Sequence, residues 1–311
     1  MTVRVRRMFS ALFVSWLLGT TSFAAASDLP TVLPQNVKVV HFPSASIGDE
    51  RTLLVILPPD YDTAVRRYPT LYLLHGYDAD ITGWARATNL SVYAARHQLI
   101  IVTPDASRAW YVNSVSDQKA KFDDFIVKDV IGYVDAHFRT VPEPFARAIA
   151  GVSMGGSGAV FLGLKHHDTF AAIGSFSGTL AAAHEKPPAL AADAPEAMRK
   201  ALRDYEALVG VYGSQEQKDR DPFEWAAKIP VEDVPMLFII CGGQDGNAEP
   251  THEFLSLLAK RRIPYEYREI SPRGHDWRIW DEEIPVFLDK LDRLEGFGSA
   301  LTEGRPEHLR P

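Results

Sequence analysis

Residues 147–161 have the sequence RAIAGVSMGGSGAVF, in which a short apolar run leads into a string of small residues. Residues 148–150 are typical of the end of a buried strand, and residues 151–155 match the pattern G-x-S-x-G. Between a strand and a helix this pattern predicts a nucleophile elbow, a strained turn that exposes the Ser153 hydroxyl at the carboxyl end of a sheet. The pattern alone also allows a glycine-rich turn with an incidental serine. Phosphate-loop motifs do not fit, because no Gly-Lys-Ser/Thr follows.

The bulk composition restricts the classes of partner. The 311 residues suffice for one large α/β domain or two small ones, and 46% hydrophobic and 23% charged residues are ordinary for a globular protein. The net charge is −7, and it becomes −10 if the basic N-terminal segment is removed. We therefore expect neither nucleic acid nor an anionic membrane surface as a partner. Cys241 is the only cysteine, which excludes an intrachain disulfide and favours a buried structural thiol.

Residues 1–26 have the pattern of an export signal. Arg4, Arg6 and Arg7 form a basic start, residues 11–18 are largely apolar, and an alanine run precedes Ser27. The apolar run is short for a transmembrane helix, so no stable membrane insertion is expected after cleavage. The pattern predicts a periplasmic or secreted protein. It does not decide between the general and the twin-arginine export routes.

The rest of the chain alternates between strand and helix patterns. Apart from the stretch quoted above, strands are predicted at 37–42, 51–57, 70–74, 98–103, 171–176, 236–241 and 265–270. Helices are predicted at 89–97, 122–138, 196–209, 253–260 and 281–294. This alternation predicts an α/β fold with a mostly parallel central sheet and helices on both faces. Residues 27–311 are thus expected to form one domain, with a small helical insertion at about 180–230.

Ser153 requires a general base and a carboxylate that orients this base, because a serine hydroxyl is by itself a weak nucleophile. In this kind of fold the order should be serine, acid, histidine, each just after a strand. Asp245 follows the strand at 236–241 within the glycine-rich run 242–246. An aspartate beside glycine is often only a turn residue, but its position in this order favours the catalytic acid. Asp276 is the alternative carboxylate.

His275 is the candidate general base, since no other histidine lies between the last predicted strand and the closing helix. The alternative is a capping or packed histidine. Five other histidines lie on predicted helices, where a structural or solvated role is the default: His97, His137, His166, His167 and His252. The dipeptides at 166–167 and 252–253 lack H-E-x-x-H spacing, so no metal site is predicted.

An oxyanion hole needs two N–H donors. The N–H of Met154, directly after the nucleophile, is one candidate, and the loop after the strand at 70–74 should supply the other. We expect that donor to be the N–H of Tyr77, with Gly76 allowing a close approach and His75 as a structural hydrogen-bonding group. Possible substrate-binding residues are aromatic side chains near strand ends, which are as often packed core: Trp84, Trp110, Tyr111 and Trp277.

Taken together, these motifs resemble the esterase D-like putative-esterase family, which includes tributyrin, feruloyl and acetyl-xylan esterases, S-formylglutathione hydrolases and mycolyltransferases. The resemblance covers roughly residues 37–291 and rests on the runs LLHGY at 73–77, GVSMGG at 151–156, CG at 241–242 and GHDW at 274–277. It implies an α/β-hydrolase fold with Ser153, Asp245 and His275 as catalytic triad. Many relatives have a glycine-rich stretch where this chain has residues 106–109, which leaves the alcohol part of the substrate open.

The leading functional prediction is an exported serine carboxylesterase acting on short-chain acyl esters, which include acetyl-sugar (glycan) or feruloyl esters. An S-formylglutathione hydrolase-like thioesterase or an acyltransferase would use the same triad. A non-catalytic binding module on a hydrolase fold is the alternative from another class. No cofactor is expected, and the sequence does not determine the oligomeric state.

Overall fold

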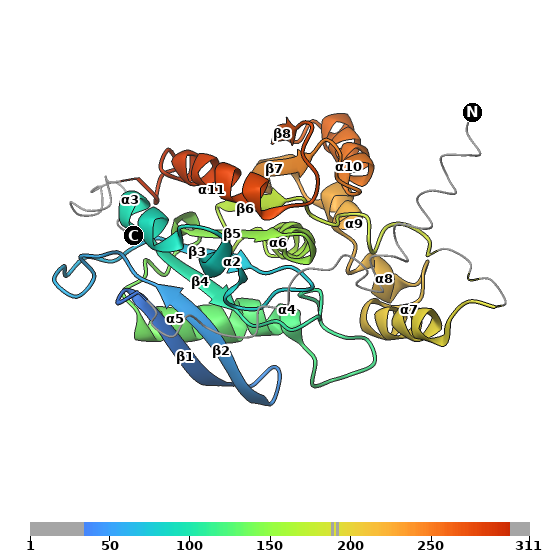
Figure 1. Ribbon diagram of the computed structural model, residues 1–311, viewed down its shortest axis with the longest axis horizontal. Coiled ribbons are helices and arrows are strands. Elements are labelled where there is room, and N and C mark those ends of the chain that lie inside the picture. The colour runs from blue at the N-terminus through green and yellow to red at the C-terminus, as the bar shows by residue number, and fades with distance from the viewer. Residues whose placement is uncertain (1–33, 188–189, 191–192, 299–311) are drawn as a thin grey trace.

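The computed structural model describes residues 34–187, 190 and 193–298, and in these residues eight strands form one sheet (Figure 1). The order across the sheet is β1-β2-β4-β3-β5-β6-β7-β8. The pairs β1–β2 and β2–β4 are antiparallel, and all pairs from β4 to β8 are parallel. The strands are β1 Val37–Ser44, β2 Asp49–Ile56, β3 Thr70–Leu74, β4 Ile100–Pro104, β5 Arg147–Val152, β6 Ala172–Phe176, β7 Met236–Gly242 and β8 Glu266–Ile270. The predicted mostly parallel sheet is confirmed.

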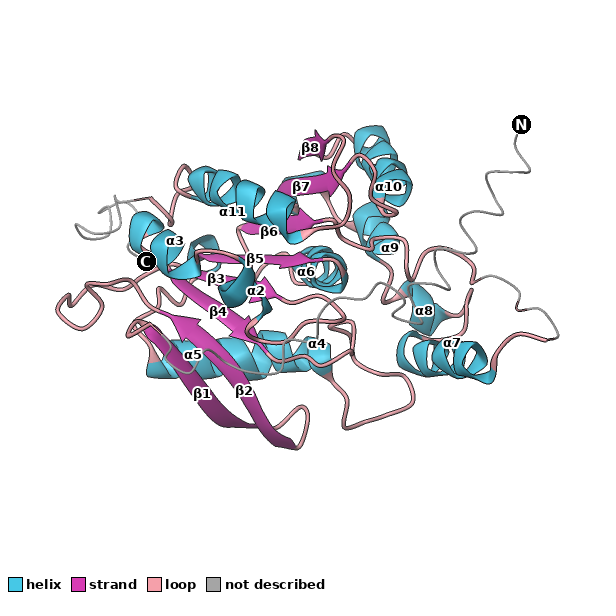
Figure 2. Cartoon of the chain, viewed as in Figure 1, coloured by secondary structure: helices cyan, strands magenta, loops and turns pink. Residues whose placement is uncertain are grey.

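Helices follow most of the strands and cover both faces of the sheet (Figure 2). They are α2 Gly83–Ala87, α3 Leu90–His97, α4 Phe122–Asp124, α5 Ile131–His137, α6 Met154–Lys165, α7 Glu196–Val209, α8 Gln215–Lys218, α9 Pro222–Lys228, α10 Ala248–Arg261 and α11 Trp277–Leu291. A π-helical segment, Phe125–Val130, joins α4 to α5. The predicted helix at 122–138 is therefore one helical stretch with a wider turn in its middle.

Two hydrophobic layers, one on each face, hold the helices to the sheet. In β3, Leu71 and Leu73 contribute to the layer under α2, α3 and α11, whereas Tyr72 and Leu74 contribute to the layer under α5, α6 and α10. Successive side chains of a strand point to opposite faces, so a strand covered on both faces must be apolar throughout. All residues of β3 are buried accordingly. Along a strand covered in this way, charged side chains have room only beyond its ends.

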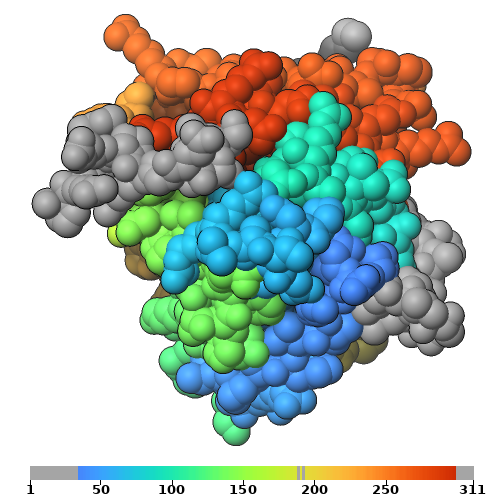
Figure 3. Space-filling view, turned by 90° about the vertical axis from the view of Figure 1, so that its left-hand side faces the viewer, coloured from blue at the N-terminus to red at the C-terminus, as the bar shows by residue number. Residues whose placement is uncertain are grey.

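Helices α3 and α11 lie side by side although they are far apart in the sequence. Figure 3 shows the teal segment around α3 against the orange and red C-terminal part of the chain. The Tyr93 hydroxyl of α3 donates a hydrogen bond of 2.7 Å to Asp281 of α11. The start of α11 differs from the prediction by four residues, because Asp276 caps the helix by accepting the N–H of Arg278 at 2.9 Å.

The segment between β6 and β7, predicted as an insertion, contains α7, α8 and α9. Helix α9 packs against α6 and α10. At the C-terminal end of α7, the Leu208 carbonyl accepts the Val115 N–H at 3.0 Å.

The predicted export signal lies outside the described residues. No helix in the described part of the chain has the length and apolar character needed to cross a membrane.

Candidate active site

Ser153 occupies a sharp turn between β5 and α6. Its backbone angles, φ 55° and ψ −119°, lie in a region that costs energy for a residue with a side chain. The glycines on either side are required by packing: a Cβ on Gly151 would lie 2.3 Å from the Gly155 carbonyl oxygen, and one on Gly155 would lie 2.5 Å from that of Leu74. The structure thus contains the strand–turn–helix geometry that the sequence predicts around Ser153.

Neighbouring backbone holds the strained turn in place. The Ser153 N–H donates to the Phe176 carbonyl at 2.9 Å, and the Ser153 carbonyl accepts the Ser157 N–H at 3.1 Å. The side chain lies at the N-terminus of α6, where the helix dipole favours negative charge. Ser153 is only 7% exposed. A reacting group here would be largely shielded from water.

Asp245 and His275 come together from the loops after β7 and β8. The Nδ1–H of His275 donates to Oδ2 of Asp245 at 2.8 Å. The two loops pack tightly, since a Cβ on Gly242 would lie 2.5 Å from the Gly274 carbonyl oxygen, and the Gln244 N–H donates to the Arg273 carbonyl at 2.8 Å. Ser153, Asp245 and His275 all follow the carboxyl ends of parallel strands, as the sequence predicts.

The surroundings of Asp245 keep its carboxylate charged. Burial by itself raises its pKa, but the hydrogen bond and charge of His275, with hydrogen bonds from the Asn247 N–H and Ser177, lower the pKa below its usual value. The Asn247 N–H donates to Oδ1 at 2.9 Å, so both carboxylate oxygens have partners. An ionised Asp245 fixes the proton of His275 on Nδ1.

Three residues near this pair were not predicted as site residues. The Ser177 hydroxyl accepts the Trp280 indole N–H at 3.1 Å, and the Asn247 amide donates to the Ser177 carbonyl at 3.0 Å. The Trp280 ring packs edge-on against His275, with centroids 4.9 Å apart. Ser177 lies at the end of β6 with φ 50°, an unusual value for serine. Its position after a strand was the only sequence signal for such a role.

Asp276, the alternative carboxylate, is the N-cap residue of α11 and accepts the Arg278 N–H. The structure therefore gives it a helix-capping function, in which its carboxylate accepts a backbone N–H that has no partner within the helix. The carboxylate hydrogen-bonded to His275 in the structure is that of Asp245.

The loop after β3 lies directly beside Ser153. A Cβ on Gly76 would come within 3.4 Å of the Ser153 Cβ, so Gly76 allows the close approach expected of an oxyanion loop. Met154 is the first residue of α6, where backbone N–H groups have no partner within the helix. His75 is buried and hydrogen-bonded to backbone on both ring nitrogens, as a structural histidine would be.

The four aromatic residues predicted near the substrate differ in accessibility. Trp84 is fully buried, its indole N–H donates to the Leu74 carbonyl at 2.9 Å, and it therefore supports the site from within the core. Tyr111 is also fully buried and donates to the His75 carbonyl at 2.9 Å. Trp110 is 6% exposed and packs against Tyr205 of α7. Trp277 is half-buried, and it is the most accessible residue of these four.

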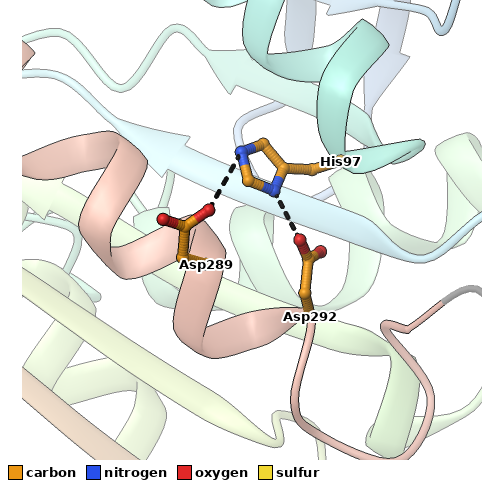
Figure 4. Close-up of side chains that lie close together, drawn as sticks. All are labelled: His97, Asp289 and Asp292. Carbon is orange, nitrogen blue, oxygen red and sulfur yellow. Dashed lines mark hydrogen bonds and ion pairs between the residues drawn. The ribbon is translucent and has the colours of Figure 1, made fainter.

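One cluster, His97 with Asp289 and Asp292, combines metal-ligating residue types (Figure 4). The His97 Nδ1–H donates to Asp292 at 2.8 Å, and Nε2 lies 4.0 Å from Asp289. The carboxylates face opposite nitrogens of one ring, as Figure 4 shows, whereas a metal ion binds a single nitrogen of each imidazole. The cluster therefore fits an ion-pair link between α3 and the end of α11 better than a three-ligand metal site.

Comparison with known proteins gives a family match over most of the chain. A family model described as "Putative esterase" matches residues 44–291. An acetyl esterase from Caldicellulosiruptor saccharolyticus is 26% identical over 267 residues, which are 82% of this chain and 97% of that protein.

Two solved structures from Staphylococcus aureus are similar over nearly their whole length. One is a fluorophosphonate-binding serine hydrolase with substrate bound, with a TM-score of 0.70 and 29% identity over 82% of this chain and 97% of the other. The second is an S-formylglutathione hydrolase, with a TM-score of 0.67 and 27% identity over 82% and 98%. The predicted α/β-hydrolase fold is confirmed by this similarity and by the observed sheet.

Proposed function

Because this chain belongs to the putative esterase family and is a carboxylic ester hydrolase, we propose that it cleaves its substrate through an acyl-enzyme on Ser153. The observation that carries the proposal is the 2.8 Å hydrogen bond from His275 to Asp245 at the same sheet edge as the strained turn of Ser153. Such a pair supplies an oriented general base to a serine.

In the proposed reaction Ser153 Oγ attacks the ester carbonyl carbon while His275 Nε2 takes the hydroxyl proton. Asp245 holds the proton on Nδ1 and stabilises the imidazolium. The N–H groups of Met154 and Tyr77 stabilise the oxyanion that forms on the carbonyl oxygen. The C–O bond then breaks, and His275 returns the proton to the leaving alcohol.

The second half of the reaction uses the same groups. A water molecule gives a proton to His275 Nε2 and attacks the acyl carbon, and a second oxyanion forms at the same donors. The bond to Ser153 Oγ breaks as His275 returns that proton to the oxygen. The carboxylic acid leaves and the free enzyme is restored.

Labelling with a fluorophosphonate probe tests the nucleophile. We expect mass spectrometry to find the adduct on Ser153, and Ser153→Ala to abolish both labelling and ester hydrolysis. The matched control is Ser157→Ala, since Ser157 lies one turn along α6 and is equally buried at 7% exposure. An adduct on another residue, or full activity in Ser153→Ala, would contradict the proposal.

We propose short-chain acyl esters as substrates, including acetyl-sugar and feruloyl esters. The similarity to an acetyl esterase supports this, and the segment after β6 continues with the buried apolar residues Leu180 and three alanines at 181–183. The test is kcat/KM for nitrophenyl esters of increasing acyl length, followed by a panel of feruloyl and acetyl-sugar esters. A steady rise of kcat/KM towards long acyl chains would exclude this substrate class.

A thioesterase is the second candidate, favoured by the similarity to an S-formylglutathione hydrolase. Both functions use the same proposed triad, so the substrate panel has to include S-formylglutathione. A kcat/KM for the thioester far above that for every oxygen ester would assign this second function.

We also propose export, on the basis of the signal pattern in residues 1–26. Fractionation of expressing cells should place the enzyme outside the cytoplasm, with a mature N-terminus at Ser27. An uncleaved cytoplasmic protein would contradict this proposal without affecting the proposed chemistry.

A further inference from the structure

The backbone on both sides of Tyr77 is held by side chains. The Gly76 carbonyl accepts the Nδ1–H of His75 at 2.8 Å, and the Tyr77 carbonyl accepts Nε–H of Arg108 at 3.3 Å. The Gly76 carbonyl and the Tyr77 N–H belong to one planar peptide group and point in opposite directions. A donor that fixes the Gly76 oxygen therefore also fixes the direction of the Tyr77 N–H.

His75 can serve as this donor only with its proton on Nδ1. Its Nε2 accepts the Ala106 N–H at 3.2 Å, which leaves the single proton of a neutral imidazole on Nδ1. Burial lowers the pKa of His75, which favours this neutral form. The Tyr111 hydroxyl donates to the His75 carbonyl, so the loop at 106–111 holds His75 through both its ring and its backbone.

Arg108 contacts the same loop from the solvent side. Besides the Tyr77 carbonyl, its guanidinium reaches Asp78 at 3.2 Å and lies 4.7 Å from the centre of the Tyr77 ring. The Arg108 side chain is 63% exposed, so its replacement should not disturb the core.

We propose that His75 and Arg108 are positioning residues that aim the Tyr77 N–H at the developing oxyanion. The inference rests on the proposed role of Tyr77 as an oxyanion donor. The hydrogen bond to the Gly76 oxygen also polarises the peptide, which makes the N–H at its other end a stronger donor. The loop at 106–111 thereby acts on the reaction through the backbone, without contact with the reacting atoms.

The test uses a readout specific to the oxyanion, the affinity for a trifluoromethyl ketone that forms a tetrahedral adduct with the serine. Arg108→Gln should lower kcat and this affinity by about threefold to tenfold, with KM nearly unchanged. Removal of one oxyanion donor costs about 10²–10³ in kcat, and a donor that is only misdirected should lose part of that factor. The kcat and ketone affinity of Arg108→Lys should lie between those of wild type and Arg108→Gln, since lysine keeps the charge but lacks the planar guanidinium group.

Arg96→Gln is the matched control, because Arg96 is 65% exposed and paired with Asp289 on α11. The Arg108 role is overturned if Arg108→Gln behaves like this control. It is also overturned if KM rises while kcat is unchanged, since that result identifies a substrate contact.

His75 is tested by two replacements. His75→Phe removes the donor and should cost about 10–100-fold in kcat and in ketone affinity, whereas His75→Asn can place an amide N–H near the Nδ1 position and should recover part of the loss. Circular dichroism and melting curves check that each variant is folded. If His75→Phe is not folded, the kcat and ketone affinity of His75→Asn and Arg108→Gln test the proposal instead.

Equal losses in His75→Phe and His75→Asn would overturn the His75 role. Failure of the proposed function itself is recognised separately, because wild-type enzyme would then carry no fluorophosphonate adduct on Ser153. The His75 and Arg108 variants should still form the fluorophosphonate adduct on Ser153, but at a lower rate than wild type.

Discussion

Nδ1 of His275 and Oδ2 of Asp245 lie 2.8 Å apart, although 30 residues separate them in the sequence. One comes from the loop after β8 and the other from the loop after β7, which are neighbouring strands. The contact follows from the parallel pairing, since parallel strands bring their carboxyl ends to one edge of the sheet.

Replacement of Asp245 by asparagine should reduce kcat by about 10⁴, if the analogy with serine-protease triads holds. The amide would leave the histidine in the wrong tautomer while it preserves the shape of the site. Steady-state kinetics with a nitrophenyl ester measures the loss. Asp276→Asn is the control, and because Asp276 only caps α11 it should keep activity and lose at most about 1 kcal/mol of stability. Near-normal activity in Asp245→Asn would show that another carboxylate orients His275.

The acidic side of the pH–activity profile should show the titration of one group. Hydrogen bonds and the charge of His275 outweigh burial and hold the pKa of Asp245 below its usual value. Asp245 therefore stays ionised over this part of the profile, and its protonation should add no second step to the loss of activity. A log plot of kcat/KM should have a limiting slope of one. A slope of two would mean that a second group titrates over the same range.

Tyr77 should tolerate loss of its hydroxyl but not of its N–H. Tyr77→Phe retains the proposed oxyanion donor and the ring beneath Arg108, so kcat should change little. Tyr77→Pro removes the N–H and should lose about 10²–10³ in kcat. Melting curves must first show that the proline variant is folded, because proline also restricts Gly76. A large loss of kcat in a folded Tyr77→Phe would mean that the phenol itself donates to the oxyanion or binds the substrate.

The glycine at 151 should be irreplaceable for steric reasons. In Gly151→Ala the new Cβ would lie 2.3 Å from the Gly155 carbonyl oxygen, so the elbow has to move and both stability and activity should fall. Gly132→Ala in α5 is the matched control, since its Cβ meets nothing within 4 Å and alanine favours a helix by about 0.5–1 kcal/mol. Thermal melting and activity compare the two. A stable, active Gly151→Ala would contradict the packing described for the elbow.

Asp123 should contribute pH-dependent stability. Burial raises its pKa, but the hydrogen bond of His166 and the charge of Lys165 outweigh burial and lower it. A lowered pKa in the folded state stabilises the protein above the unfolded value and loses that effect as the pH falls through the folded value. Asp123→Asn should therefore cost about 1–3 kcal/mol at pH 7. Denaturant melts should show the difference from wild type shrinking below about pH 4.

The control for this experiment is Asp124→Asn, which breaks a pair with the exposed Lys128 one helical turn away and should leave the melting temperature almost unchanged. A difference between Asp123→Asn and wild type that stays constant from pH 7 to pH 3 would rule out the proposed charge effect.

The sequence by itself determined the features that depend on neighbouring residues. The strand at 70–74 has the predicted bounds because its run of apolar residues ends at His75. The elbow around Ser153 was predictable because only glycine fits at positions 151 and 155 of so tight a turn. The order of Ser153, Asp245 and His275 could be inferred since each follows an apolar strand pattern in turn.

Only the tertiary structure decided which distant side chains meet and which are covered. The indole of Trp280 reaches Ser177 across 103 residues, and His97 reaches Asp292 across 195, and neither contact leaves a local pattern. Trp84 and Trp277 were equivalent candidates by sequence, but the first is fully buried and the second is not. The physical reason is that propensity and periodicity report on a few adjacent residues, whereas strand order and helix packing place residues that lie far apart in the chain.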